Sequence, residues 1–430
     1  MAKINLSVKI LIGLLVGGIL GVAAKALGHD SLWVPWVVEN IALPSGQIFL
    51  RLLFMLVIPM LFSALVIAIC GLDVRHLGRM GGRTLGYTVV ASLIAVLIGM
   101  GLTNLIQPGA GLPEEARQIA KANSATVTIP KLPDTTGVAL LVTMVPDNPV
   151  KAAANGDMIG VILFSLIFGV GLSMTRTPAA LRLREVIEGI YDVSMTLIHG
   201  VLKLAPYGVA ALIFTMTARL GTDLLPYLLK YVGVVLLGLG LQMFVVYSLA
   251  LHFLGGRSPL EFFRNVRVAM ITAFATASSS ATLPTALTVA EENLKLPRHV
   301  SRFVLTAGSA MNQNGTALFE GVTVLFLAQL FGVDLSLGQQ FLIMSICVLG
   351  GIGTAGIPAG SLPVIAMILV TFGIPVEGLA LILGVDRFLD MCRTTLNVTG
   401  DLVAAVYVAR GESEQEITLG TEPSSSGVNR

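Results

Sequence analysis

The sequence predicts an all-α integral membrane protein, with eight transmembrane helices and two re-entrant helical hairpins that form inverted repeats. Three observations support this fold class. Of the 430 residues, 55% are hydrophobic and 12% are charged, with a mean hydropathy of +0.86, whereas soluble domains carry about 25% charged residues. Long apolar segments recur along the chain, and two further apolar segments are interrupted by small residues at their middles. The last apolar segment carries a row of charged and amide side chains.

The long apolar segments account for the expected transmembrane helices. About 20 residues are needed to cross a bilayer, and several segments are longer, so we expect tilt or breaks. The eight segments are 8–27, 46–70, 84–106, 137–175, 185–220, 224–254, 300–331 and 375–410.

Basic residues in short loops predict the orientation. Cytoplasmic loops are enriched in Lys and Arg, and three clusters alternate with less basic loops, which places both termini in the cytoplasm. We therefore expect a multi-pass protein of the cell (inner) membrane, with residues 411–430 as a disordered cytoplasmic tail. The clusters are Arg75, Arg79 and Arg83, then Arg176, Arg182 and Arg184, then Arg257, Arg264 and Arg267.

Residues 258–293 and 338–371 are predicted to be the hairpins. Each is too short to cross twice, because two crossings need about 40 residues. Their middles read SSSATLP (278–284) and GTAGIP (353–358). Non-helical backbone at this depth is tolerated only where it lines an enclosed or wet cavity. The loop count gives the two hairpins opposite orientations, and inverted repeats with broken helices are typical of secondary transporters.

Five polar residues of the last segment lie on one helical face. At about 100° per residue, the side chains fall within an arc of about 80°. A charge at the bilayer centre costs about 2.5–3.5 kcal/mol, so this polar stripe indicates a binding site. The stripe consists of Asp386, Asp390, Arg393, Asn397 and Asp401. The preceding segment contains NQNGT (312–316), whose amide and carbonyl oxygens would suit a hard cation such as Na⁺.

Four motifs carry a resemblance to a known family: SSSATLP (278–284), NQNGT (312–316), GTAGIP (353–358) and DMCRTTLNVTGD (390–401). Together they resemble the dicarboxylate/amino acid:cation symporters, the family of the glutamate transporters, over about residues 8–410. The resemblance implies an elevator-type glutamate transporter fold and a homotrimer. The implied scaffold is 1–83 (spans one and two) and 137–223 (spans four and five). The implied transport domain is 84–136 (span three and an external loop) and 224–410, which holds span six, hairpin 258–293, span seven, hairpin 338–371 and span eight.

The resemblance also implies a substrate site. Arg393 would pair with a substrate side-chain carboxylate, which suits the planar guanidinium. Asp390 would pair with the substrate ammonium, and Asn397 with Ser279 would bind the α-carboxylate. The other implied substrate-binding residues are Ala277, Ser278, Thr316, Ile357, Gly360, Ser361, Arg387 and Thr394.

Two cation sites follow from the same resemblance. The first would use carbonyls of Gly308, Asn312 and Asn397 with the carboxylate of Asp401. The second would use carbonyls of Ala310, Gly351, Ile352 and Thr354. A third site, at Ser92 and Asn314, is in doubt because archaeal members have Asp where Asn314 stands, and Tyr and Thr where Thr88 and Ala91 stand. We therefore expect Na⁺ as the coupling ion, with H⁺ as the alternative.

Structural readings of the same residues remain open. As an alternative to binding a substrate, Asp390 and Arg393 could form a structural ion pair one turn apart inside the helix bundle. Archaeal members of the family have Arg before the serines, where this chain has Ala277. In one alternative Arg387 approaches the ligand and would supply that charge, and in the other it neutralises Asp386 or Asp390. Asn314 is either a cation ligand or a packing residue.

The resemblance implies a non-enzymatic secondary-active symporter for aspartate or glutamate, with partners limited to substrate, lipid bilayer and its own copies; we expect neither nucleic acid nor an organic cofactor. Transport of C4-dicarboxylates or neutral amino acids is the alternative within the family. An intramembrane serine hydrolase would need a base near Ser278–Ser280, and no His or Lys lies in the membrane part of that hairpin. A passive anion channel is the remaining class.

Overall fold

The computed structural model describes residues 6–27, 33–71, 78–111, 145–155, 158–220, 225–353 and 361–410. These residues form helices and short connections, and no strand occurs among them. The helices of the first half are α1 (Leu6–Leu27), α2 (Trp33–Val37), η1 (Val38–Ala42), α3 (Leu43–Met55), α4 (Val57–Gly71), α5 (Gly78–Ile106), α8 (Pro149–Asn155), α9 (Met158–Met174), α10 (Pro178–Leu202) and α11 (Ala205–Leu220).

The second half of the chain contains most of the residues of interest. Its helices are α12 (Leu225–Leu241), η3 (Gln242–Val246), α13 (Tyr247–Leu249), η4 (Ala250–Gly255), α14 (Pro259–Thr276), α15 (Ser279–Thr288), η5 (Val289–Asn293), α16 (Arg298–Met311), α17 (Asn314–Phe331), α18 (Leu337–Gly353), α19 (Ser361–Thr371), η6 (Val376–Gly378) and α20 (Leu379–Ala409).

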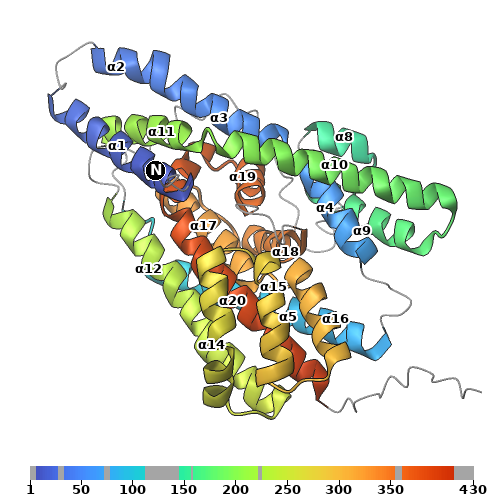
Figure 1. Cartoon of the computed structure of the whole chain (residues 1–430). Helices are drawn as coiled ribbons and strands as arrows, with labels where there is room; N and C mark the ends of the chain where they lie inside the picture. Colours follow the sequence, from blue (N-terminus) through green and yellow to red (C-terminus); the bar gives the residue numbers. More distant parts are fainter. Residues whose placement is uncertain are drawn as a thin grey trace, which may run out of the picture.

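The helices pack in two groups (Figure 1). In the first group α1 packs along α11, α3 packs on α11, and α4 packs on α9 and α10. Gly13, Gly17 and Gly21 let α1 approach closely, because a Cβ at each would collide with α11 at Pro206, Ala210 and Thr217. Small residues at this spacing are a common means of helix packing in membranes.

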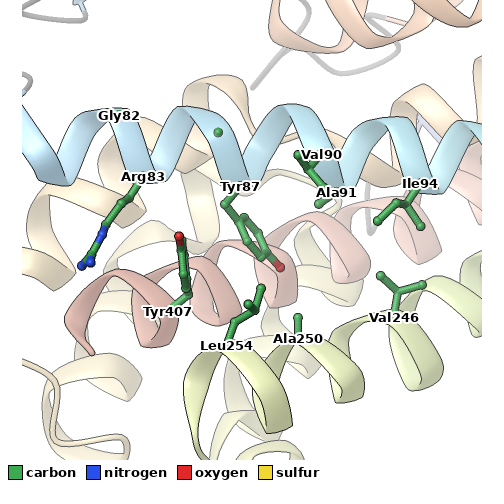
Figure 2. Close-up of a pocket in the computed structure, with 11 residues that line it drawn as sticks. Gly82, Arg83, Tyr87, Val90, Ala91, Ile94, Val246, Ala250, Leu254 and Tyr407 are labelled. Carbon is green, nitrogen blue, oxygen red and sulfur yellow. The ribbon is translucent and has the colours of Figure 1, made fainter. Parts of the chain in front are cut away.

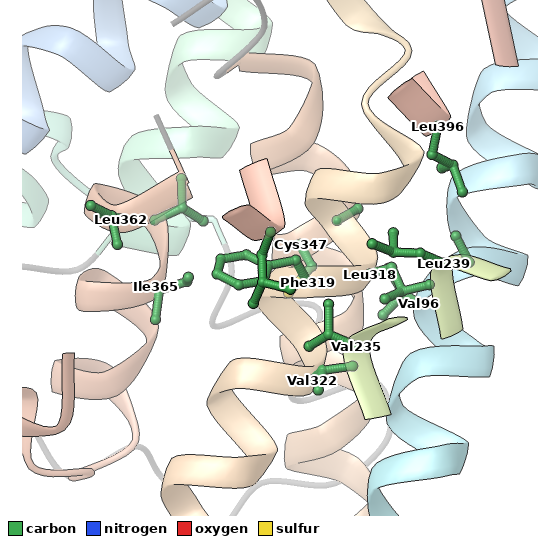
Figure 3. Packing of buried hydrophobic residues seen from close by; sticks show 14 of the residues in the cluster. Val96, Val235, Leu239, Leu318, Phe319, Val322, Cys347, Leu362, Ile365 and Leu396 are labelled. Carbon is green, nitrogen blue, oxygen red and sulfur yellow. The ribbon is translucent and has the colours of Figure 1, made fainter. Parts of the chain in front are cut away.

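The second group surrounds α17 and α20. Helix α5 packs on α17, and α20 packs on α14, α16 and α17. All residues of α17 are buried except Thr316 and Gln329, so this helix forms the centre of the group. Figure 3 shows Phe319, Leu318 and Val322 of α17 among side chains from α5, α12, α18, α19 and α20.

Three described helical stretches are long and apolar enough to cross a membrane: Met80–Ile106, Leu225–Gly255 and Arg298–Phe331. A fourth is α10 with α11, which pass the same test together although they are bent by 54°. Four further apolar helices are shorter: Ile12–Ala26, Ile58–Ile67, Gly160–Met174 and Leu337–Gly351. Helix α20 has 31 residues but carries the polar stripe. The structure therefore supports a membrane protein, and the count of eight spans stays a prediction.

Both predicted hairpin segments contain two helices. In the first, α14 and α15 pack on each other and are joined by Ala277 and Ser278. Ala277 adopts a left-handed conformation with a φ of +47°, which reverses the chain. In the second, α18 and α19 pack on each other, and residues 354–360 between them lie outside the described residues. Re-entry of these hairpins into a membrane remains a prediction.

The predicted polar interruption is a break between α16 and α17. Asn312 has φ −94° and ψ 78°, and Gln313 has φ −109° and ψ 51°. Neither conformation is helical, so backbone carbonyl groups at this point lack the regular helical hydrogen bonds. The break faces α20, on which the polar stripe lies.

Candidate functional site

The middle of α20 holds a cluster of four charged side chains. Arg393 is 1% exposed and its Nη2 lies 2.9 Å from Asp386 Oδ1 and 3.0 Å from Asp390 Oδ1. Its Nη1 donates to Ser361 Oγ at 3.0 Å, and its Cζ lies 3.8 Å from the centre of the Phe319 ring. The buried Nε has no hydrogen-bond partner among the described residues. Arg393 is therefore fixed in place and retains one donor for a further acceptor.

Arg387 pairs with the same acidic group. Its Nη1 lies 3.2 Å from Asp390 Oδ2, and its side chain is 38% exposed. Asp390 thus has one oxygen facing each arginine. Asp390 and Arg393 therefore do form an ion pair, and Arg387 pairs with Asp390 and not with Asp386.

One turn further along α20, Asn397 connects the stripe to the helix break. Its Oδ1 accepts from the Gly315 amide at 2.8 Å, and its Nδ2 donates to Gln313 Oε1. Nδ2 also lies 3.3 Å from Thr316 Oγ1. The structure therefore brings Thr316 and Asn397 together, one turn from Arg393. Thr394, which follows Arg393 in the sequence, is buried.

The first hairpin places its tip near this face, since α14 and α15 both pack on α20. Ser278 caps α15, with its Oγ accepting from the Ala281 amide at 3.2 Å. Ser279 and Ala277 are buried, each with 5% exposure. Within the described residues, no hydrogen bond joins Ser278 or Ser279 to α20. Of the second hairpin, Ser361 contacts Arg393, whereas Ile357 and Gly360 lie outside the described residues.

The expected first cation site brings three of its residues together. The side-chain Nδ2 of Asn312 donates to Asp401 Oδ1 at 2.8 Å, and the backbone N–H of Asn312 donates to the Gly308 carbonyl at 2.7 Å. A Cβ on Gly308 would lie 2.5 Å from Asp401 Oδ1, so only glycine allows this approach. Asn312 Oδ1 is buried and has no hydrogen-bond partner in the described part of the chain.

These atoms fit a hard cation. The site offers a carboxylate, an unpartnered amide oxygen and backbone carbonyls, which are the ligand types that such ions take in proteins. No group of three or more His, Cys, Asp or Glu side chains suited to a metal occurs among the described residues. Asn397 contributes to this region through its hydrogen bonds to Gln313 and Gly315.

The expected second cation site is only partly described. Gly351 lies in the last turn of α18, and a Cβ on it would lie 3.5 Å from the Gln313 carbonyl oxygen. Ile352 follows it in α18, and Ala310 lies in α16 just before the break. Thr354 lies outside the described residues. The described members are thus found at or beside the α16–α17 break.

The expected third site contains a hydrogen-bonded chain. Ser92 Oγ donates to Asn314 Oδ1 at 2.7 Å, and Asn314 Nδ2 donates to the Tyr247 hydroxyl at 2.9 Å. The amide of Asn314 is therefore used on both sides, which favours a packing role over cation binding. Nearby, Thr88 Oγ1 and Gln242 Oε1 are buried without a hydrogen-bond partner among the described residues.

Glu320 is a site residue that the sequence analysis missed. It is fully buried one turn after Thr316, and neither carboxyl oxygen has a hydrogen-bond partner in the described structure. Its neighbour Phe319 lies under the Arg393 guanidinium. An isolated acidic residue in an apolar span is by itself a functional signal, and that signal was present in the sequence.

Comparisons with known proteins identify the family of this chain. The profile of the sodium:dicarboxylate symporter family matches residues 6–411. A proton/glutamate-aspartate symporter of Escherichia coli is 35% identical over 424 residues, covering 95% of this chain and 93% of that protein. A proton/sodium-glutamate symport protein of Geobacillus stearothermophilus is 33% identical, covering 96% of each chain. A C4-dicarboxylate transport protein of Rhodospirillum rubrum is 33% identical, covering 86% of this chain and 83% of that protein. This chain therefore belongs to the sodium:dicarboxylate symporter family, whose members are transporters and not enzymes.

Proposed function

We propose that this protein is a secondary-active symporter that carries aspartate or glutamate across the membrane together with Na⁺ or H⁺. The observation that carries the proposal is the pair of links between α20 and one helix break. Asn397 is bonded to Gln313, and Asp401 is bonded to Asn312. Arg393 lies one turn before Asn397 on α20, so the arginine proposed to bind an anion and the carboxylate proposed to bind a cation would belong to one connected arrangement.

The charged cluster suits an amphoteric acidic ligand. Arg393 offers a planar guanidinium with a free buried Nε for the side-chain carboxylate. Asp390 is 17% exposed and is the acidic partner for an ammonium group. Asn397 with Thr316 completes the polar lining. The relatives named for glutamate and aspartate support this substrate class.

Coupling follows from the shared break. A cation held between Asp401 and Asn312 would fix the backbone at 312–313, and this backbone positions Gln313 and Asn397. Binding of the cation and of the substrate would then favour the same arrangement, and such coupling is reciprocal. The glycine-rich second hairpin would close over the ligand.

An elevator mechanism in a homotrimer completes the proposal. The group of helices around α17 and α20 would move as the transport domain (84–136 and 224–410). The group around α1 and α11 would remain as the scaffold (1–83 and 137–223). The location is the cell (inner) membrane, with both termini and the 411–430 tail in the cytoplasm.

C4-dicarboxylate transport is the second candidate, and one observation favours it. The ion pair of Arg387 with Asp390 weakens the repulsion that Asp390 would exert on a ligand lacking an ammonium. A relative named as a C4-dicarboxylate transport protein supports it as well. Competition of unlabelled succinate against labelled aspartate separates the two substrates.

Uptake into proteoliposomes tests the function. Labelled aspartate should accumulate under an inward Na⁺ or H⁺ gradient, and absence of accumulation under both gradients would contradict the proposal. Glu320→Gln identifies the ion. If Glu320 carries the coupling proton, the variant loses the pH dependence of uptake; if Na⁺ alone drives transport, Na⁺ dependence and rate stay as in the wild type.

A further inference from the structure

A groove of about 480 Å³ lies between α5, the turns η3 and η4, and the end of α20 (Figure 2). Of its lining residues, Ala91 borders the expected third cation site at Ser92, and none of the others belongs to the substrate or cation sites discussed above. A volume of roughly 300–1,000 Å³ is typical of sites that hold a small molecule.

The rim of the groove is apolar and open. Val90 and Leu254 line it and are 55% and 45% exposed. Phe253 and Phe244, from η4 and η3, are 68% and 62% exposed. Exposed apolar side chains on membrane-spanning helices face acyl chains, so the groove opens toward lipid.

The length and ends of the groove match one leaflet. Arg83 and Ile94 lie at opposite ends of the row of α5 side chains in Figure 2. The eleven steps from Arg83 to Ile94 rise about 16 Å, about half of the ~30 Å hydrocarbon core. A groove of this length would reach from headgroup level at the Arg83 end to near the middle of the bilayer.

Basic groups gather at the Arg83 end. Arg410 Nη1 donates to the carbonyls of Phe253 and Leu254 at 3.0 and 2.9 Å, and Leu254 lines the groove. None of the lining residues is acidic. This end is complementary to an anionic headgroup.

The inner wall is made of small and aromatic residues. A Cβ added to Gly82 or Gly86 would meet no atom within 4 Å, so these glycines leave space in the groove. Tyr87 stacks on Tyr407 of α20, with ring centroids 6.0 Å apart. A molecule in the groove would contact α5, η4 and α20 together.

We propose that this groove binds one phospholipid with an anionic headgroup. The phosphate lies beside Arg83 and Arg410, and one acyl chain lies along Gly86, Val90 and Ile94. Because α5 carries Ser92 and α20 carries Asp401, the lipid stabilises the packing of two helices that flank the cation sites.

Lipid binding is tested on the full-length protein, purified in non-ionic detergent and stripped of lipid. The probes are dioleoyl phosphatidylglycerol and dioleoyl phosphatidylcholine, read by native mass spectrometry and by thermal unfolding. We expect one retained phosphatidylglycerol per chain and a rise in Tm of about 2 °C or more, with less than half this effect for phosphatidylcholine. Gly86→Leu fills the groove and should remove both effects. Gly101→Leu on the same helix, where a Cβ also meets nothing, is the matched control and should keep them.

Arg83→Gln gives a second, milder variant. It should bind both lipids equally, because the proposed contact of Arg83 with the headgroup is lost while the groove itself stays open. Unchanged phosphatidylglycerol binding in both Gly86→Leu and Arg83→Gln would overturn the proposal. Equal effects of the two lipids on the wild type would overturn it as well, and so would an equal effect of free oleate. A change in oligomeric mass in Gly86→Leu with lipid binding retained would instead identify a second helix as the occupant.

Discussion

Arg393 illustrates how much the contacts of one side chain constrain its role. Its guanidinium is held by two carboxylates, one hydroxyl and one aromatic ring, yet its Nε has no partner among the described residues. A purely structural ion pair would be expected to satisfy all buried donors. The unpaired donor therefore favours a ligand carboxylate at this position.

Replacing Arg393 with Lys tests this role. Lysine keeps the charge but loses the planar fork, so aspartate affinity should fall by about 30-fold or more, equivalent to about 2 kcal/mol. Calorimetric titration of the purified protein measures this. Arg302→Lys on the exposed side of α16 is the control. A wild-type affinity in Arg393→Lys would contradict the assignment.

Arg387 is tested by its effect on ligand choice. Arg387→Gln removes the cationic partner of Asp390 Oδ2, so that the negative charge of Asp390 is neutralised less. Succinate, which has no ammonium, should then compete about 5-fold less well against aspartate than in the wild type. The measurement is the ratio of inhibition constants in uptake assays. An equal loss for both ligands would show that Arg387 binds a carboxylate itself.

For the individual residues, the sequence indicated most members of the charged cluster on α20 but not which side chains pair with each other. The spacing placed Asp386, Asp390 and Arg393 on one face, and the ion pair between Asp390 and Arg393 was one open alternative. The contact with Asp386 was not predicted, because side-chain rotamers and the position of the second hairpin decide it. Glu320 was not predicted, because it lies outside the break formed by the Asn and Gly residues of that span, one turn beyond Thr316.

The helix break is the element on which coupling depends. Asn and Gly in an apolar span predicted it, and α16 indeed ends at Met311. The helices on both sides of the first hairpin tip also follow the prediction, since small residues and Ser278 at the cap position favour a turn there. The length of segment 185–220 predicted tilt or a break, but the position of the bend between α10 and α11 was not predicted, because apolar composition continues across it.

Gly308→Ala tests the break as a cation site. The added methyl group would lie 2.5 Å from Asp401 Oδ1, so the carboxylate must move. We expect the cation concentration for half-maximal aspartate uptake to rise at least about 10-fold, because a displaced charge loses more than about 1.4 kcal/mol. Gly240→Ala, in open space on α12, should behave as the wild type. An unchanged cation dependence in Gly308→Ala would exclude this site.

For the whole molecule, the charged residues of the site predict how much net charge crosses the membrane with each substrate. Two arginines, Arg387 and Arg393, and three acidic groups, Asp386, Asp390 and Asp401, belong to the site on α20. Glu320 is counted as uncharged because its buried carboxyl oxygens have no hydrogen-bond partner among the described residues. A substrate with one net negative charge would then need two cations for a neutral loaded site, since net charge is costly in the membrane.

Uptake should therefore move one net positive charge inward with each aspartate. A potassium diffusion potential set with valinomycin, negative inside the proteoliposomes, should accelerate uptake, because each charge gains about 2.3 kcal/mol per 100 mV. Protein-free vesicles provide the leak control. Acceleration by a positive interior would contradict this charge balance.

Equilibrium binding shows whether aspartate and the cation bind to α20 in a linked way. Aspartate affinity is measured on the purified protein across a matrix of Na⁺ concentration and pH. Affinity should rise with Na⁺ at fixed pH, or with proton concentration at fixed Na⁺, and Asp401→Asn should weaken this dependence. An aspartate affinity that changes with neither ion would exclude linked binding at this site.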